Sequence, residues 1–110
     1  MTHPYSYEAY LSLPPGYLTE LKQELLTEIA LYGRRTCERI MRDYNYRRRH
    51  HGLNMRDPNT LRPRIIELKQ AGVLMEVGET KTPSNRRAAL IDISPHWREH
   101  LLQTKLPTTQ

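Results

Sequence analysis

The sequence predicts a small α+β domain, mainly α, in which three helices precede a β-hairpin and a short last helix. Apolar residues recur with the helical period in three segments between Leu18 and Ala71, and the period changes to two after Gly72. The chain has 110 residues, of which 37% are hydrophobic, below the roughly 45–50% of typical globular domains. A single domain with a small core is therefore expected.

The first helix is expected to begin at Leu18 and to stop at Gly33, because glycine commonly follows a helix C-terminus. Its apolar stripe follows helical spacing. The stripe comprises Leu18, Leu21, Leu25, Ile29 and Tyr32, with Leu26 beside it.

The second helix is expected over Thr36 to Tyr44, with Thr36 as the N-cap. Its apolar face comprises Cys37, Ile40, Met41 and Tyr44. The segment Tyr46–Arg56 shows no convincing period and contains Gly52. It is expected to be a basic turn or loop, with a helical extension into Arg47–Arg49 as the open alternative.

The third helix is expected from about Asn59 to Ala71, with a stripe of Leu61, Ile65 and Leu68. Proline is tolerated in the first turn of a helix but clashes deeper inside it. Pro63 therefore places the helix start near Asn59 or Thr60, with Asn59 or Asp57 as the cap.

Beyond Gly72, two β-type segments, Val73–Val77 and Ala88–Ile93, flank a polar loop at Gly78–Arg87, so a hairpin with a basic tip is expected. Ser94 followed by Pro95 is typical of a helix start and predicts a short helix to Leu102, in which Trp97 pairs with Leu101.

Three parts of the chain follow from this division. They are a Tyr/Pro-rich N-terminal arm (1–17), the main domain (18–93), and the short C-terminal helix with a polar tail (94–110). Neither a secretory signal nor an apolar run of membrane-spanning length is visible, so a cytoplasmic protein without a membrane partner is expected. The single cysteine, Cys37, excludes a disulfide framework.

The positive charge is concentrated in one third of the chain. Lysine and arginine total 17 against 12 acidic residues, a net charge of +5. Residues 33–64 hold ten arginines, no lysine and three acids, so this segment carries the whole excess. Arginine pairs bidentately with phosphates and with guanine edges, which favours nucleic acid as the partner.

The order of elements and two segments resemble the winged helix-turn-helix superfamily of small bacterial and phage DNA-binding domains. The segment Leu61–Leu74 (LRPRIIELKQAGVL) is similar to its recognition-helix-to-wing junction, and Gly78–Ala88 (GETKTPSNRRA) is similar to its wing. The chain departs from the pattern at Asn85, where glycine is common, and in the long link from Tyr44 to Asn59.

This resemblance implies a double-stranded DNA-binding protein, with recognition helix 59–71 in the major groove and wing 78–87 on the backbone. It further implies a transcriptional regulator or an accessory protein of phage or mobile-element DNA. The expected DNA-binding residues are Arg34, Arg35, Arg39, Arg42, Arg47, Arg48, Arg49, Asn59, Thr60, Arg62, Arg64, Lys81, Arg86 and Arg87.

Other readings stay open. Arg64 can instead pair with Glu67 or Glu38, and Arg39 with Asp43. The domain can also be a protein-interaction adapter in a nucleoprotein complex, or can bind RNA through residues 46–51. A homodimer through the N-terminal arm or the C-terminal helix, with Trp97, Leu101 and Leu102, is a further expectation.

Catalytic and metal-binding patterns are weak. His96 and His100 have a metal-compatible spacing but no evident third ligand, and Cys37 falls on an apolar stripe. The chain has no glycine-rich phosphate loop and no nucleophile elbow. We therefore expect no enzyme activity, no cofactor and no metal.

Overall fold

A computed structural model describes residues 16–104, and of residues 100–104 it describes the backbone alone. The chain forms α2 (Glu20–Tyr32), β1 (Arg35–Thr36), α3 (Cys37–His50), α4 (Pro58–Gln70), β2 (Leu74–Lys81), β3 (Arg87–Ile93) and α5 (Pro95–Thr104). The strands form one antiparallel sheet in the order β1-β3-β2. The predicted α+β class with mainly helical content is confirmed, and the layout is compatible with a winged helix. The expected arm (1–17) and tail lie largely outside the described residues.

Helix α2 begins and ends close to where the sequence predicts. The Thr19 side chain accepts a hydrogen bond from the Lys22 backbone N–H, so Thr19 is the N-cap. Gly33 follows the last turn with φ of 87°, a conformation that favours glycine, and its N–H donates to the carbonyl of Ile29. Tyr32 is exposed, although the sequence predicts it on the buried apolar stripe.

Helix α3 is longer than expected. Thr36 caps its start as predicted, by accepting a bond from the Arg39 backbone N–H. The helix passes Tyr44 and continues to His50, so the extension through Arg47–Arg49 forms and the loop covers only the residues after it. Side-chain bonds to α2 hold this extension: the Tyr44 hydroxyl donates to Glu24, and Arg47 donates to Glu28.

Helix α4 begins one residue before the expected range. Asp57 is the N-cap, and its carboxylate accepts a bond from the Asn59 backbone N–H. Pro58 occupies the first helical position, so Pro63 lies in the second turn, contrary to the expected first turn. Pro63 has no N–H to donate to the carbonyl of Asn59, and the helix continues without that bond.

The hairpin and its third strand complete the sheet. Strands β2 and β3 pair from Leu74 with Ile93 to Lys81 with Arg87, with an irregularity between Glu76 and Gly78. The loop is therefore shorter than the expected Gly78–Arg87. Strand β1 was not predicted, because two residues give no pattern; it pairs with Leu90 and Ile91 of β3.

The core gathers apolar side chains from every helix and from the sheet. The predicted stripes of α2, α3 and α4 all contribute, and Trp97 of α5 is only 1% exposed. Trp97 therefore belongs to the core, which corrects its expected place on a dimer surface. The fully buried large side chains are Leu25, Leu26, Ile29, Ile40, Leu61, Ile65, Leu68, Val73, Leu74 and Trp97.

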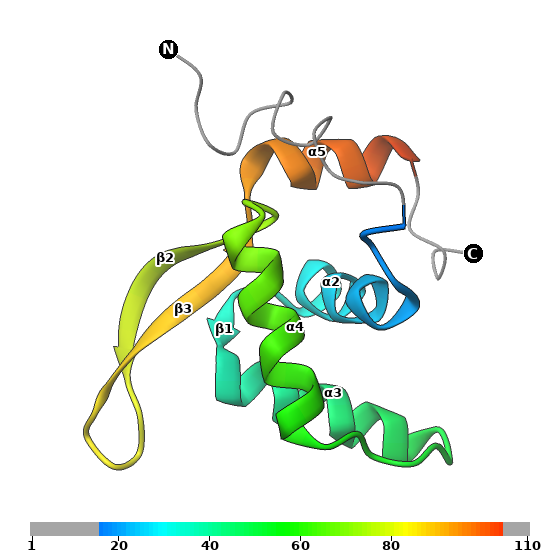
Figure 1. Ribbon diagram of the computed structural model, residues 1–110. Helices are drawn as coiled ribbons and strands as arrows, with labels where there is room; N and C mark the ends of the chain where they lie inside the picture. Colours follow the sequence, from blue (N-terminus) through cyan, green and yellow to red (C-terminus); the bar gives the residue numbers. More distant parts are fainter. Residues whose placement is uncertain (1–15, 105–110) are drawn as a thin grey trace.

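The arrangement leaves the hairpin free at one end. In Figure 1 the tip of the hairpin lies at the end of the molecule opposite α5, beyond the packed helices. Ser94 ties the end of β3 to the link between α4 and β2, because its hydroxyl donates to the carbonyl of Gly72 and its N–H donates to the carbonyl of Val73. None of the described helices is long and apolar enough to cross a membrane.

Candidate nucleic-acid interface

A basic groove of about 760 Å³ lies between the start of α3 and the outer half of the hairpin. Two groups of cations from distant parts of the sequence line it. Glu38 is the one carboxylate among the described residues that line this groove. The lining cations are Arg34, Arg35, Arg39, Arg42, Lys81, Arg86 and Arg87.

The short strand β1 fixes the α3 side of the groove. Because β1 pairs with β3, the first turn of α3 is attached to the same sheet that carries the hairpin. Arg34 lies 3.5 Å from Asp92, and Arg39 lies 3.5 Å from Asp43, yet both side chains remain 57% exposed. Asp92 keeps Arg98 as a partner and Asp43 keeps Arg35 when these exposed arginines move, so both guanidinium groups are available to phosphates.

The hairpin side is held by a tight, hydrogen-bonded tip. The Thr82 N–H donates to the carbonyl of Arg86, and the Asn85 N–H donates to the carbonyl of Thr82, both at 2.8 Å. The Thr82 hydroxyl also accepts from the Arg86 N–H. Asn85 has φ of 64°, which asparagine tolerates better than most residues, so its place in a position typical of glycine is explained.

The basic residues on the hairpin are exposed. Lys81 and Arg86 form no ion pair within the described part of the chain. Arg87 lies 3.7 Å from Glu79, but the two side chains are 80% and 63% exposed, so water screens the pair. All three positions were expected to contact DNA, and the structure places them on one wall of the groove.

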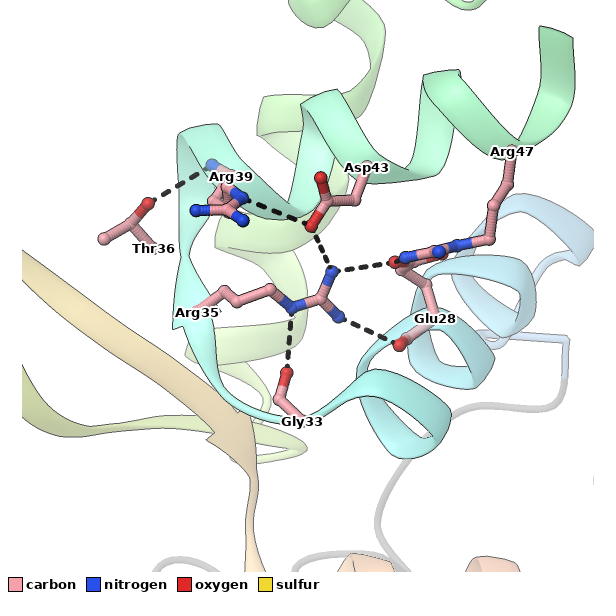
Figure 2. A network of polar contacts seen from close by, with 7 residues as sticks. All are labelled: Glu28, Gly33, Arg35, Thr36, Arg39, Asp43 and Arg47. Atoms are coloured by element: carbon pink, nitrogen blue, oxygen red, sulfur yellow. Dashed lines mark hydrogen bonds and ion pairs between the residues drawn. The ribbon is translucent and has the colours of Figure 1, made fainter. Parts of the chain in front are cut away.

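Arg35 lines the groove only with its stem. Its guanidinium donates to the carboxylates of Glu28 and Asp43 and to the carbonyls of Glu28 and Gly33, at 2.8–3.0 Å (Figure 2). The side chain is 13% exposed and that of Glu28 is 5% exposed. The phosphate contact of Arg35 stays a prediction, and it would require Arg35 to leave a buried carboxylate that then keeps only Arg47 as a side-chain partner.

The three consecutive arginines at residues 47–49 have different environments in the structure. Arg47 pairs with Glu28 and covers the ring of Tyr32 at 3.5 Å. Arg48 donates to the carbonyl of Asn54 at 2.6 Å and lies 3.8 Å from Glu24. Both form contacts within the protein, so their expected nucleic-acid contacts stay predictions that would require these contacts to break. Arg49 alone of the three is exposed without an ion pair in the described region.

The outward face of α4 forms a shallow hollow of about 350 Å³. Asn59 and Gln70 are exposed there, as the sequence predicts, and Pro63 lies between them. Thr60 is exposed in the first turn, and its N–H donates to the carbonyl of Asp57. This face therefore presents amide side chains that can pair with base edges.

The two arginines of α4 are both in ion pairs. Arg62 donates to Glu38 of α3, and this hydrogen bond raises the pKa of Arg62. Arg64 donates to Glu67 at 2.8 Å, one turn along the helix. The open alternative in which Arg64 pairs with Glu67 is therefore confirmed, whereas the pair between Arg62 and Glu38 was not predicted.

Glu67 connects α4 to α2. Although burial acts to raise the pKa of Glu67, hydrogen bonds from Lys22 and Arg64 outweigh it, so its pKa is lowered. The backbone carbonyl of Glu67 also accepts a bond from the Tyr17 hydroxyl at 2.7 Å, and Lys22 lies over the Tyr17 ring. These contacts fix the orientation of α4 against the core.

No metal centre is visible in residues 16–104 as far as their side chains are described: no group of three or more His, Cys, Asp or Glu residues is suitably placed. The side chain of His100, expected as a partner of His96, lies outside the described part. Burial, the largest effect, raises the pKa of the Cys37 thiol, as expected for a cysteine on an apolar stripe.

The prediction from sequence missed the polar side chains between the cations. Thr36, Thr80, Thr82 and Ser84 also line the groove and supply hydroxyl groups. Hydroxyls commonly contact phosphate oxygens. The polar composition of the hairpin loop could have indicated the residues of the hairpin. Thr36 could not be predicted in this way, because only the pairing of β1 with β3 places it beside the loop.

Comparisons with protein-family models, with curated protein sequences and with solved structures give no significant match to this chain.

Proposed function

We propose that this protein is a winged-helix protein that binds double-stranded DNA. One observation carries the proposal: cations at the start of α3 and cations of the hairpin, about 45 residues apart in sequence, line one groove. A groove whose lining is predominantly positive attracts a polyanion, and arginine is the residue best suited to phosphate.

The topology supports the same proposal. The order of three helices followed by a hairpin is compatible with the layout that the sequence resemblance implies. In such a domain α4 enters the major groove, while the hairpin and the start of α3 contact the backbone. The finer role, a transcriptional regulator or an accessory protein of phage or mobile-element DNA, rests on the resemblance alone.

Different parts of the domain are expected to supply the phosphate contacts and the base contacts. Six exposed cations of the groove can reach phosphates, which predicts a slope of log affinity against log salt of about −4 to −6. The six are Arg34, Arg39, Arg42, Lys81, Arg86 and Arg87. Asn59 and Gln70 on α4 are the candidates for base contacts, and Arg62 joins them when it leaves Glu38.

The test is a salt titration of binding to random duplex DNA, with single-stranded RNA in parallel. The double variant Lys81→Gln, Arg86→Gln is expected to flatten the slope by about 2, because two counterion-releasing contacts are lost. The control, Lys69→Gln with Arg98→Gln, removes the same charge outside the groove and is expected to leave the slope almost unchanged.

Two results would contradict the proposal. One is absence of duplex binding at low salt. The other is an equal loss in both double variants, because binding would then depend on net charge and not on the groove.

A further inference from the structure

A second hollow lies at the far end of α3, outside the basic groove. It has a volume of about 580 Å³ and is formed by the last turns of α3 and the loop that follows. Its lining comprises Arg42, Asn45, Tyr46, Arg49, His50 and Met55. None of these except Arg42 takes part in the function proposed above.

An exposed aromatic pair forms one wall of this hollow. The Tyr46 side chain is 67% exposed. Its ring stacks on that of His50, with centroids 6.2 Å apart and planes inclined by 15°. A flat aromatic surface open to solvent is the feature on which proteins stack unpaired bases, irrespective of sequence.

The charge of the hollow fits a phosphate. Arg42 and Arg49 form no ion pair within the described region, whereas Arg47 and Arg48, between them in sequence, are committed to Glu28 and Glu24. No carboxylate belongs to the described lining of the hollow. Two uncommitted guanidinium groups therefore flank the aromatic wall.

The loop side is preorganised by Asn45. Its amide N–H donates to the carbonyl of Arg56, and its amide oxygen accepts from the Arg56 N–H, both at 2.9 Å. This reciprocal pair holds the loop against α3 and keeps Met55 at the hollow. A site that is ordered before binding loses less conformational entropy when a ligand arrives.

Arg42 connects the two sites, because it lines both the basic groove and this hollow. We propose that the hollow binds an unpaired nucleotide of a single-stranded segment that continues from the duplex in the groove. The base stacks on Tyr46, and its phosphates contact Arg42 and Arg49. This inference rests on the proposed function, because it takes the single strand to continue from a duplex bound in the groove.

The test compares a blunt duplex with the same duplex carrying a three-nucleotide single-stranded overhang, at either end polarity, by fluorescence anisotropy. A third probe carries an abasic overhang, which keeps the phosphates and lacks the bases. One overhang polarity is expected to bind about fivefold to a hundredfold more tightly than the blunt duplex, since stacking of one base has this effect. The abasic overhang is expected to give only a small part of the gain.

Variants of Tyr46 test whether its ring causes the gain in affinity from the overhang. Tyr46→Ala is expected to abolish the overhang advantage while leaving affinity for the blunt duplex unchanged, and Tyr46→Phe is expected to retain the advantage. The matched control is Tyr32→Ala, which removes another exposed tyrosine that does not line the hollow. Thermal melts of each variant verify that it is folded.

The outcomes separate the two proposals. Blunt-duplex binding without an overhang advantage overturns this inference and leaves the proposed function standing. Binding of single strands that depends on Tyr46, without duplex binding, overturns the proposed function and also the inference that the strand continues from a bound duplex. Loss of self-association in Tyr46→Ala, with no overhang advantage, identifies the hollow as an interface between copies of the chain and overturns the inference.

Discussion

Arg62 of α4 donates a hydrogen bond to Glu38 at the start of α3, so a candidate DNA-contacting residue is held by the carboxylate that lines the basic groove. The pair has two effects. It orients α4 relative to the groove, and it places the single negative charge of the described lining where a phosphate would approach. DNA must therefore compete with Glu38 for Arg62.

Replacing Glu38 with glutamine is expected to strengthen DNA binding about threefold to tenfold and to steepen the salt slope by about 1, because Arg62 becomes free and a repulsive charge is removed. The pair is exposed, so the melting temperature should change little. Glu76→Gln is the matched control, because Glu76 pairs with Lys69 outside the groove. A salt titration that gives the same gain for both variants, or no gain for Glu38→Gln, contradicts this prediction.

Arg35 and Arg39 are expected to differ sharply, although both contact Asp43. Arg35→Ala should lower the free energy of unfolding by about 2–4 kcal/mol, because it removes one partner of buried Glu28 while Arg47 remains. Arg39→Ala should cost only about 0–1 kcal/mol, as for exposed ion pairs, but should reduce the salt slope of DNA binding by about 1. Urea denaturation and salt titration measure the two effects. Equal destabilisation by both substitutions would show that the buried network is not what holds the start of α3.

Asn85 at the hairpin tip is expected to tolerate glycine but not alanine. Its φ of 64° disfavours residues with an ordinary Cβ, so Asn85→Ala should destabilise the protein by about 1 kcal/mol. DNA affinity should also fall, because the tip positions Arg86. Asn85→Gly should match the parent protein within about 0.5 kcal/mol. Chemical denaturation and anisotropy test this ordering, and an alanine variant indistinguishable from the glycine variant would refute it.

The lowered pKa of Glu67 predicts a contribution to stability that is lost at low pH. A carboxylate with a lowered pKa in the folded state stabilises the protein above its ordinary pKa of 4.5, and this contribution is lost as the pH falls through the folded value. The parent protein should therefore lose more stability between pH 5 and pH 3 than Glu67→Gln, measured by urea midpoints at each pH.

The difference should be small and should shrink in high salt, because the Glu67 side chain is 38% exposed. A steeper loss of stability in the Glu67→Gln variant than in the parent would reverse the sign and contradict the assignment.

Local patterns account for most of the secondary structure. The apolar spacings of α2 and α4, the caps at Thr36 and Asp57, and the change to period two after Gly72 all act through residues close in sequence. Their physics is local, since a cap bonds its own first turn and a stripe defines one helix face.

The end of α3 was harder to predict for a definite reason. Tyr46–His50 has no apolar period, and its helical state depends on contacts of Arg47 and Arg48 with Glu28 and Glu24, some 20 residues away in α2. Strand β1 was missed for a similar reason, because it exists only through its pairing with β3. Neither partner can be identified from spacing.

The sequence by itself determined that the middle third of the chain is rich in arginine and that a basic hairpin follows it. Only the tertiary structure decided which arginines are available to a ligand. Arg34 and Arg35 are neighbours in sequence, yet one is exposed at the groove and the other is enclosed by Glu28 and Asp43. Successive side chains of an extended strand point to opposite sides, and which side is buried depends on what packs there.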